Sequence, residues 1–406
     1  MRIKLLLCIS ALLLILQAQA DASPRKDPQP DKRSVLQMID KGLEHSRSQA
    51  LLLAETLIPM ENKLPRTYQN DKLYVTDYSA WTSGFYPGLL WQLYEAFGDD
   101  RLLEYAIYFT DIVEPAKNVR SHHDVGFMIY CSAGHAYRLT GKSHYLDIIM
   151  TASESLISRY NPVIGAIRSW DWNKEWKYPV IIDNMMNLEM LCFASQQSGD
   201  SKYCDIAVRH ADTTIKNHFR DDNGSWHVVS YDPQTGEPHV KTTHQGFSED
   251  SAWARGQAWG LYGYVMMYRQ TADPAYLAQA KKIASFLVKH PNMPEDMIPY
   301  WDFDSPDIPD DVRDASAGAI MASALLELSV LDKSKDSRLW YRTAVRQLIS
   351  LSSEQYLAAA GTNGGFILKH STGFKLRASE VDVPLSYADY YYVEALLRLK
   401  KLLSGK

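Results

Sequence analysis

Two aspartates stand at positions where a carboxyl group could act as an acid. Asp124 follows two histidines and precedes an apolar stretch, and Asp183 follows Val-Ile-Ile and leads into a run rich in Met, Leu and Phe. A poorly solvated carboxyl has a raised pKa and can remain protonated as a general acid, and imidazoles beside a carboxylate can tune its pKa. Two carboxyls that face one cavity suit glycoside cleavage. The alternative is that each aspartate caps the helix that follows it.

A second group of reactive residue types lies between residues 243 and 260. Arg255 and Trp259 are one helical turn apart and would share a helix face. An arginine can clamp a carboxylate through two parallel hydrogen bonds, and a tryptophan offers a flat face to a sugar ring. The alternative is a buried arginine that pairs with an acidic residue of a loop. The spacing therefore predicts either a binding site for an anionic sugar or an internal ion pair.

The sequence offers little for metal or nucleotide chemistry. His122, His123 and Asp124 are consecutive, so their side chains point in different directions and make a poor set of metal ligands. The acidic segment 301–314 lacks the spacing and the glycine of an EF-hand loop, and we expect a rim loop in which Asp314 caps the next helix. Walker A, G-x-G-x-x-G, nucleophile-elbow and H-E-x-x-H motifs are absent. We therefore expect no metal centre.

The elements that must position these residues are paired helices. A polar turn followed by a new helix start recurs at Gly98, Gly141, Gly199, Asp273 and Asp332. The helix before each turn is apolar with small residues, and the helix after it carries charges on one face. The amphipathic, outer helices are expected at 33–58, 102–114, 145–159, 203–218, 275–289 and 336–354. The apolar, inner helices are expected at 81–97, 126–139, 183–198, 251–270, 315–331 and 387–403.

Six helix pairs of this kind predict an all-α fold, the (α/α)6 toroid. An open solenoid is the alternative, and it would end in a helix with a polar outer face. The last expected helix, residues 387–403, is as apolar as the internal ones. The pattern therefore favours a closed ring.

The long connections all precede inner helices, so they should gather at one end of the ring. Functional residues are expected there, because a rigid scaffold positions variable loops. Aromatic, imidazole and carboxylate side chains occur in or next to these connections: Trp81, His122, His123, Asp124, Trp170, Trp172, Trp176, Asp183, His227, His244, Gln245 and Trp301. Their convergence on one opening predicts a carbohydrate site.

The first twenty residues have the features of a secretory signal. Arg2 and Lys4 precede an apolar stretch, residues 5–16, that is too short to anchor the chain in a bilayer. Ala18-Gln19-Ala20 is a small-residue cleavage site. We predict cleavage after it, export to the periplasm or the medium, and no membrane insertion of the mature chain.

The remainder of the chain is expected to form a flexible tether, residues 21–32, and a single catalytic domain, residues 33–406. The 43 basic against 48 acidic residues give a net charge of −5, which leaves no basic surface for a nucleic acid partner. Cys131, Cys192 and Cys204 make an odd, low count that argues against a disulfide framework. We expect three buried thiols, with pairing of Cys192 and Cys204 as the open alternative.

Four stretches of the sequence resemble the unsaturated glucuronyl hydrolases of glycoside hydrolase family 88. They are His123-Asp124-x-Gly126-Phe127, Ile182-Asp183-x-x-x-Asn187-Leu188, the block from Gln245 to Gly260 that contains Trp253-x-Arg255-Gly256-Gln257-Ala258-Trp259, and Pro299-Tyr300-Trp301-Asp302-Phe303. The third is the most specific, and the resemblance covers nearly the whole mature chain. It implies an (α/α)6 barrel, in agreement with the helix count, and activity on the unsaturated oligosaccharides that polysaccharide lyases leave.

The resemblance also implies a reaction. The terminal uronic acid of such a substrate has a C4=C5 double bond, which is an enol ether; an acid protonates C4, water adds at C5, and the hemiketal collapses and releases the aglycone. By resemblance, Asp183 is the proton donor that also activates the water, and Asp124 is the second carboxylate, which holds the uronate ring. The substrate-binding candidates are Trp81, His123, His227, Gln245, Trp253, Arg255 and Trp259. The implied partner is an unsaturated uronic-acid oligosaccharide, expected from a glycosaminoglycan, and no metal or organic cofactor is implied.

Substrate choice is where the sequence departs from the family pattern. Residues 364–375 resemble a segment in which family members that act on sulfated sugars use Ser and Lys, but the spacing differs. Ser371 and Lys375 are candidate sulfate contacts, with a solvated loop as the alternative. A family 105 unsaturated rhamnogalacturonyl hydrolase and a non-catalytic sugar-binding toroid are the other functions that this sequence could serve.

Overall fold

The computed structural model describes residues 31–405. The chain divides into a short unit, residues 1–35, and a compact unit, residues 36–406, which carries everything described below. The predicted signal and its cleavage site lie outside the described residues, as does most of the predicted tether. Within residues 31–405, none of the helices has the length and apolar character needed to cross a bilayer.

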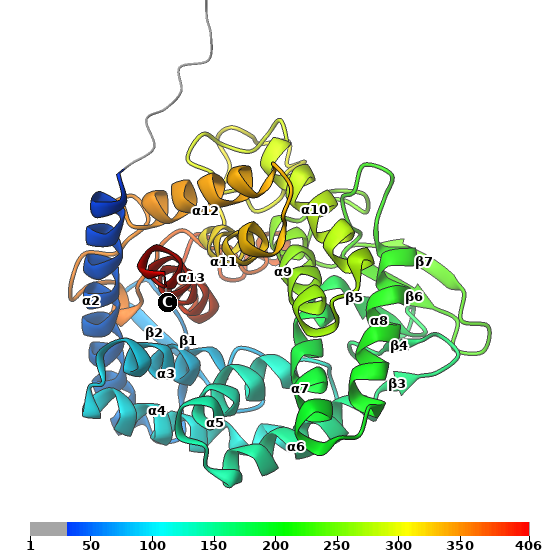
Figure 1. Cartoon of the computed structure of the whole chain (residues 1–406), viewed down its shortest axis with the longest axis horizontal. Helices are drawn as coiled ribbons and strands as arrows, with labels where there is room; N and C mark the ends of the chain where they lie inside the picture. Colours follow the sequence, from blue (N-terminus) through cyan, green and yellow to red (C-terminus); the bar gives the residue numbers. More distant parts are fainter. Residues whose placement is uncertain (1–30, 406) are drawn as a thin grey trace, which may run out of the picture. The chain divides into compact units, whose positions relative to one another are not determined.

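Two layers of α-helices, twelve within residues 31–405, make up the compact unit (Figure 1). The outer helices are α2 (Lys32–Leu57), α4 (Asp100–Val113), α6 (Ser143–Ile157), α8 (Lys202–His218), α10 (Pro274–Lys289) and α12 (Ser337–Leu351). The inner helices are α3 (Phe85–Phe97), α5 (His135–Thr140), α7 (Leu188–Ser198), α9 (Ala254–Thr271), α11 (Ala315–Leu331) and α13 (Ser386–Ser404). The predicted helix order, and the assignment of each helix to a layer, are confirmed.

The inner helices form a closed ring. Each contacts the next around the ring, except that α7 is contacted by η3 (Gly126–Gly134), the turn directly before α5; the last one, α13, packs against the first, α3. The burial of α11 explains why the inner helices are apolar: its residues from Ala315 to Leu326 are all buried between neighbouring helices. The contact between α13 and α3 confirms the (α/α)6 toroid and excludes the open solenoid.

The short turns use left-handed helix ends. Gly98, Gly141 and Gly199 end their helices with φ values of 64°, 67° and 74°, a conformation that glycine adopts without a Cβ penalty. The fourth turn places Ala272 in the same conformation, at φ 59°. Asp273 then caps α10 by accepting a hydrogen bond from the Ala275 amide at 2.8 Å.

Two inner helices begin with irregular turns that the sequence did not indicate. A π-helix, η3 (Gly126–Gly134), precedes α5, and a 3₁₀-helix, η4 (Ile182–Asn187), precedes α7. The two segments touch: the Asn187 Oδ1 accepts a hydrogen bond from the Phe127 amide at 2.9 Å. A Cβ on Gly126 would lie only 2.7 Å from the Asn187 Cα, so this close approach requires glycine.

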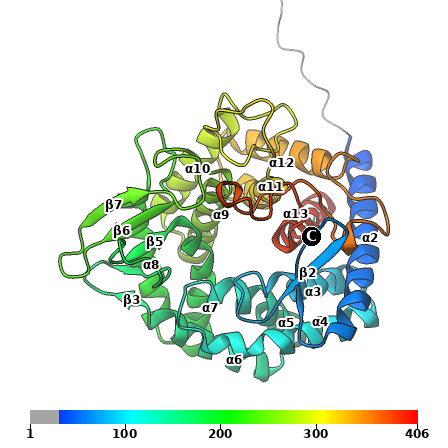
Figure 2. The ribbon, with the colours of Figure 1, turned by 180° about the vertical axis from the view of Figure 1, so that it is seen from behind.

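Short strands lie in the long connections, where the sequence predicted only loops. β1 (Leu64–Gln69) pairs with β2 (Lys72–Thr76), and β3 (Tyr160–Asn161) pairs with β4 (Ala166–Ile167). β5 (Pro179–Ile181), β6 (Val228–Tyr231) and β7 (Pro238–Thr242) form an antiparallel sheet beside α8 (Figure 2). Strand β5 runs directly into η4, which fixes where Asp183 emerges.

The prediction that all three mature cysteines are thiols is wrong. Cys192 of α7 and Cys204 of α8 form a disulfide, with their Cα atoms 4.2 Å apart. The tight turn between an inner and an outer helix brings residues twelve positions apart together, a proximity that the cysteine count does not reveal. Only Cys131 is free among the described cysteines.

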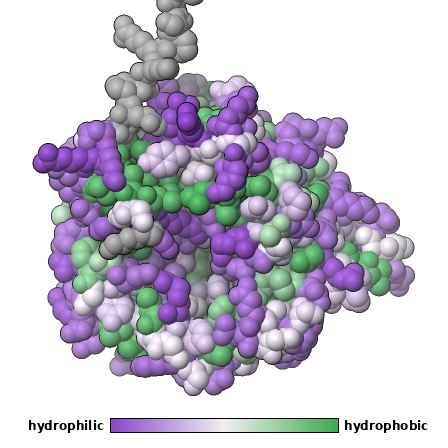
Figure 3. All heavy atoms as spheres, viewed as in Figure 1, coloured by the Kyte–Doolittle hydropathy of each residue, from purple (hydrophilic) through white to green (hydrophobic). Residues whose placement is uncertain are grey.

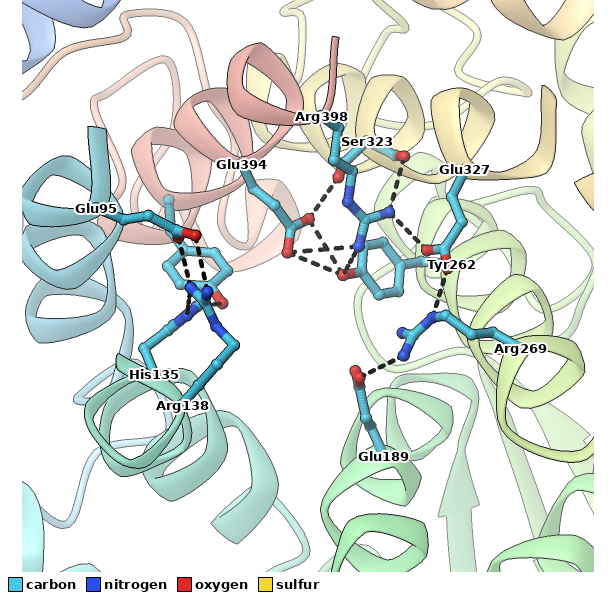
Figure 4. Close-up of polar contacts among 11 residues, drawn as sticks. Glu95, His135, Arg138, Glu189, Tyr262, Arg269, Ser323, Glu327, Glu394 and Arg398 are labelled. Carbon is cyan, nitrogen blue, oxygen red and sulfur yellow. Dashed lines mark hydrogen bonds and ion pairs between the residues drawn. The ribbon is translucent and has the colours of Figure 1, made fainter. Parts of the chain in front are cut away.

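Charged side chains join one inner helix to the next (Figure 4); most lie in the C-terminal half of their helix, whereas Glu189 lies in the first turn of α7. Arg138 of α5 donates to both carboxylate oxygens of Glu95 of α3, at 2.8 and 2.5 Å. Arg269 of α9 lies 2.9 Å from Glu189 of α7 and 2.5 Å from Glu327 of α11. These pairs tie five of the six inner helices to a neighbour.

The sixth inner helix, α13, completes this set of contacts. Arg398 lies 2.7 Å from Glu327 and 3.6 Å from Glu394, and the Tyr262 hydroxyl donates to Glu394 at 3.0 Å. We call the set the ion-pair belt: Glu95, Arg138, Glu189, Arg269, Glu327, Glu394 and Arg398. Four of its members line a cavity of about 370 Å³, and Figure 3 shows hydrophilic residues around a hollow in the same view as Figure 1.

Candidate active site

The predicted site residues gather at the other ends of the inner helices, where the long connections arrive. Asp124 precedes η3 and Asp183 lies in the first turn of η4. Trp253 and Asp314 are the residues directly before α9 and α11, and Tyr387 lies in the first turn of α13. The ring therefore brings five separate segments to one opening, as the loop distribution predicted.

Asp124 is held between two imidazoles. Its carboxylate oxygens lie 3.1 Å from the His122 Nδ1 and 3.3 Å from the His123 Nε2. Burial raises the pKa of Asp124, but the charge interaction with His123 and the hydrogen bond from His122 outweigh burial and leave the pKa below its ordinary value. Asp124 does not cap η3, since the residue at the cap position is Val125 and no side chain caps there. Asp124 is therefore an ionised carboxylate at neutral pH.

Asp183 has the opposite surroundings. Its side chain is buried, and within residues 31–405 its Oδ2 has no hydrogen-bond partner. Burial raises the pKa of Asp183 to about 7; Arg255 opposes this shift, and the negative charge of Asp124 adds to it. No side chain caps η4, so the alternative role of Asp183 as a helix cap is also excluded. A large fraction of Asp183 is therefore protonated near neutral pH.

His227 is a polar side chain that lies close to Asp183. Its Nε2 lies 3.6 Å from the Asp183 Oδ2, which is too long for a hydrogen bond. Its Nδ1 accepts hydrogen bonds from the amides of His244 and Gln245, at 3.1 and 3.2 Å. Burial lowers the pKa of His227 well below its ordinary value, so the ring is neutral. The Nδ1 contacts place its single proton on Nε2, which faces Asp183.

Arg255 is a buried ion-pair residue. Its Nη1 donates to the Asp314 Oδ2 at 2.9 Å and to the Thr372 carbonyl, and its Nη2 donates to the Gly373 carbonyl at 2.8 Å. Asp314 also caps α11 through the Ser316 amide at 3.0 Å, which confirms the predicted cap. The structure thus shows the alternative that the sequence left open for Arg255: the guanidinium orders a loop instead of reaching toward a ligand.

Aromatic rings form the wall around these groups. The guanidinium carbon of Arg255 lies 4.6 Å from the centre of the Trp253 ring, and the centre of the His227 ring lies 4.4 Å from the same point. Trp81 lies 4.9 Å from Tyr387. Trp259 is fully buried, so it shapes the wall from behind. Tyr387 was not predicted as a site residue, although its place at the start of the last inner helix matches that of Trp253 in α9.

A second aromatic group extends from the site toward solvent. Trp170 and Trp172 stack with ring centres 5.2 Å apart, and His244 lies 5.1 Å from Trp172. Phe374, which the sequence analysis did not single out, lies 4.9 Å from His244. The Gln245 side chain donates to the Gly373 carbonyl at 3.1 Å, so Gln245 also contributes to ordering this loop.

The two candidate sulfate contacts are not presented to a ligand. Ser371 is completely buried, and its backbone pairs with that of Val383. The Lys375 Nζ forms an ion pair with Asp311 and lies 3.3 Å from Asp307. In this structure one side chain is enclosed and the charge of the other is neutralised, so the geometry gives no support to sulfate contacts at these two residues, which stay a prediction.

The acidic segment between α10 and α11 uses its carboxylates to hold loops. The Asp302 Oδ2 accepts hydrogen bonds from the Phe247 amide at 2.8 Å and from the Ser251 hydroxyl at 2.7 Å. The Asp304 carboxylate accepts one from the Ala252 amide at 2.8 Å. These contacts fasten the segment to the loop that precedes α9, and so help to position Trp253.

Comparison with known proteins agrees with this geometry. The family model described as Glycosyl Hydrolase Family 88 matches residues 59–327. An unsaturated glucuronyl hydrolase of Formosa agariphila is 47% identical over 80% of this chain and 80% of its own length.

Solved structures of similar proteins share the fold. The crystal structure of an unsaturated glucuronyl hydrolase specific for heparin has a TM-score of 0.85 and 46% identity, and covers 89% of this chain and 98% of that one. A mutant unsaturated glucuronyl hydrolase of Streptococcus agalactiae, complexed with dGlcA-GalNAc6S, has a TM-score of 0.78 and 30% identity, and covers 92% of this chain and 93% of that one.

Proposed function

The chain belongs to glycosyl hydrolase family 88, and from this membership together with the site geometry we propose how its residues perform the reaction. The protein is a glycosidase that removes the unsaturated uronic acid from the non-reducing end of oligosaccharides generated by lyases from glycosaminoglycans. The match to family 88 favours this function over that of a family 105 enzyme.

The reaction needs an acid before it needs a base. The C4=C5 double bond of the sugar is an enol ether, so proton transfer to C4 places positive charge on C5, where the ring oxygen stabilises it. Water then adds to C5 and loses a proton, and the resulting hemiketal opens and releases the aglycone. One water is consumed, and a single carboxyl group can give the first proton and take up the second.

Asp183 has the properties of that carboxyl. It is the buried group whose pKa of about 7 leaves a large fraction of it protonated near neutral pH, so it can deliver a proton to C4. After the transfer it is a carboxylate, which can accept the proton of the attacking water. The Nε2–H of neutral His227 faces the Asp183 Oδ2 from 3.6 Å and can shorten to a hydrogen bond once that oxygen is charged.

Asp124 serves a different role because His122 and His123 keep it ionised. An ionised carboxylate is a hydrogen-bond acceptor only, so Asp124 can hold hydroxyl groups of the uronate ring but cannot give a proton. Its charge also favours the protonated form of Asp183, as the raised pKa of that residue reflects after the larger effect of burial. Because their surroundings differ, Asp183 serves as the acid and Asp124 as the hydrogen-bond acceptor.

The proposal rests on one observation: the buried Asp183 Oδ2 has no hydrogen-bond partner within residues 31–405, whereas the nearby Asp124 is ionised. The test is Asp183→Asn, which keeps the shape and removes the proton. We expect turnover of an unsaturated glycosaminoglycan disaccharide, followed by the loss of its ultraviolet absorbance, to fall by about 10²–10⁴, while binding of the disaccharide by titration is retained. A mutant with normal turnover would support a non-catalytic role for Asp183 and move the proton donor elsewhere.

We also propose that the chain is exported, on the support of the charged, apolar and small-residue sequence of its first twenty residues. N-terminal sequencing of the protein from the producing cells should begin at or near Asp21. A soluble cytoplasmic protein that retains Met1 would contradict export.

A further inference from the structure

A groove of about 660 Å³ lies outside the set of residues that form the candidate active site. It is formed between the segment that follows α4, the C-terminal end of α6 and the β3–β4 hairpin. Its charged lining residues are Arg120, Arg159, Arg168 and Asp171, and its aromatic ones are Tyr160 and Tyr178. Three arginines face one carboxylate, so the lining is basic although the whole chain is acidic.

Arg159 forms the floor of the groove. Its side chain is 6% exposed, and its Nη1 and Nη2 each donate to one oxygen of Asp171 at 3.0 Å. The Arg159 Nε donates to the Arg168 carbonyl at 2.8 Å, so the guanidinium is locked in place. This bidentate pair neutralises Asp171 and fixes the backbone on which the other arginines stand.

The other two arginines are available to a ligand. The Arg168 side chain is 30% exposed and shares Asp171 with Arg159, at 3.1 Å. Its guanidinium lies 5.7 Å from the centre of the Tyr178 ring, which orients it. Arg120 is exposed, and within residues 31–405 it has no acidic partner. One carboxylate therefore balances one of three positive charges, and an anion is the complement of this surface.

The groove adjoins the aromatic side of the opening. Asp171 lies between Trp170 and Trp172 in the chain, so the groove and the stacked tryptophans are one residue apart, about 3.8 Å between Cα atoms. The backbone of Trp170 pairs with that of His122, which contacts Asp124. Trp172 is 57% exposed and offers a flat apolar face between the site and the groove.

We propose that this groove is a second binding site, which takes sulfate or carboxylate groups on the sugars beyond the first two of a longer anionic oligosaccharide, with Trp172 supporting the sugar that lies between. The proposal rests on the proposed function, since it assigns the distal part of the same substrate. It supplies positive charge for sulfated sugars where Ser371 and Lys375 do not.

The test compares two substrate lengths in the full-length protein. The variant is the pair Arg120→Gln and Arg168→Gln, and the control is Arg338→Gln, an exposed arginine on the outer helix α12. We expect KM for an unsaturated heparin-derived tetrasaccharide to rise about three- to tenfold in the double variant, with kcat/KM for the unsaturated disaccharide unchanged. Added NaCl should raise the wild-type KM for the tetrasaccharide, and should raise it less in the variant.

Two results would contradict the proposal that the groove binds the substrate. If the double variant has the same KM for the tetrasaccharide as wild type, the arginines do not contact it. If kcat/KM for the disaccharide falls as much as that for the tetrasaccharide, the arginines only support the catalytic loop. Binding of a saturated heparin tetrasaccharide, measured by titration, separates this proposal from the enzymatic one. If wild type turns over neither unsaturated substrate, the proposed function fails, while weaker titration of the saturated ligand by the double variant would still support the groove.

Discussion

The two ends of the inner ring carry the same residue types in opposite states. In the ion-pair belt, the Glu327 side chain is 14% exposed, yet Arg398 and Arg269 outweigh the effect of burial and hold its pKa below the ordinary value. At the opening, the Asp183 side chain is similarly enclosed, at 12% exposed, but has no hydrogen-bond partner on Oδ2 within residues 31–405, and burial raises its pKa to about 7. Burial alone therefore does not decide what a carboxyl does; the presence of a partner does.

The belt satisfies its charges because every inner helix contributes to it. Its contacts join α3 to α5, and α7, α9, α11 and α13 to one another, while the His135 Nε2 and the Tyr390 hydroxyl, 2.9 Å apart, connect α5 with α13 (Figure 4). In the proposed function this end of the ring does no chemistry, so it can hold the helices together. We propose that the opposite end keeps Asp183 without a hydrogen-bond partner among residues 31–405 because the reaction needs its proton, although this costs stability.

The largest effect on stability is expected from breaking the belt. Arg398→Met leaves Glu394 without the cation it pairs with, while Glu327 keeps Arg269, and this should lower the free energy of unfolding by about 3–5 kcal/mol. Because no belt residue is among the charges that shift the pKa of Asp183, kcat per folded molecule should not change. Urea unfolding and disaccharide turnover measure the two quantities, and Arg342→Met, on the exposed side of α12, is the matched control. A large fall in kcat with intact stability would mean that the two ends are coupled.

A second prediction tests the ion pair that stands at the opening. Arg255→Lys replaces a planar fork, which binds Asp314 and two carbonyls, by a point charge that cannot reach all three. Loss of about 1.5–3 kcal/mol of charge-assisted hydrogen bonding should lower kcat/KM for the disaccharide by about 10- to 100-fold. The melting temperature of the same preparation reports whether the ring remains folded. If Arg255→Lys is folded and has the kcat/KM of wild type, the loop that Arg255 orders does not contribute to substrate binding or turnover.

Much of the fold could be predicted because it depends on local patterns. The apolar and amphipathic helices alternate in the sequence, and turn residues such as Gly98 and Gly199 mark the boundaries, so α2 and α11 begin and end within one residue of their predicted bounds. Asp124 and Asp183 could be found because an acid next to an apolar run is unusual.

The rest depends on contacts between distant residues. Arg255 pairs with Asp314, 59 positions later. The sequence alone does not distinguish an arginine in such an internal ion pair from one that binds a ligand. Ser371 and Lys375 lie in a segment whose motif is only partly matched, and their burial and pairing follow from the packing of three loops. The ion-pair belt also escaped prediction, because single charges such as Glu327 and Arg398 on apolar helices show no pattern until the ring closes.

The smallest effect is expected at the short turns. Ala272 adopts the left-handed conformation that Gly98, Gly141 and Gly199 adopt in equivalent turns. Ala272→Gly removes the steric cost of that conformation but gives the unfolded chain more freedom, so we expect a net gain of about 0.5–1 kcal/mol. Thermal unfolding measures it, with Ala278→Gly, at an exposed position inside α10, as a control that should lose stability. A destabilised Ala272→Gly variant would mean that strain at this turn is negligible.

The pH dependence of unfolding tests most directly whether Asp183 stays protonated because it is buried and, within residues 31–405, its Oδ2 has no hydrogen-bond partner. Since burial raises the pKa of Asp183 from 3.8 to about 7, the folded wild type binds more protons than the unfolded chain between these values. Its stability therefore falls as pH rises through that window, and Asp183→Asn removes the fall. We expect the free energy of unfolding of the mutant to rise relative to that of wild type between pH 4 and pH 8, by at most about 4 kcal/mol. A difference between mutant and wild type that stays constant across this range would contradict it.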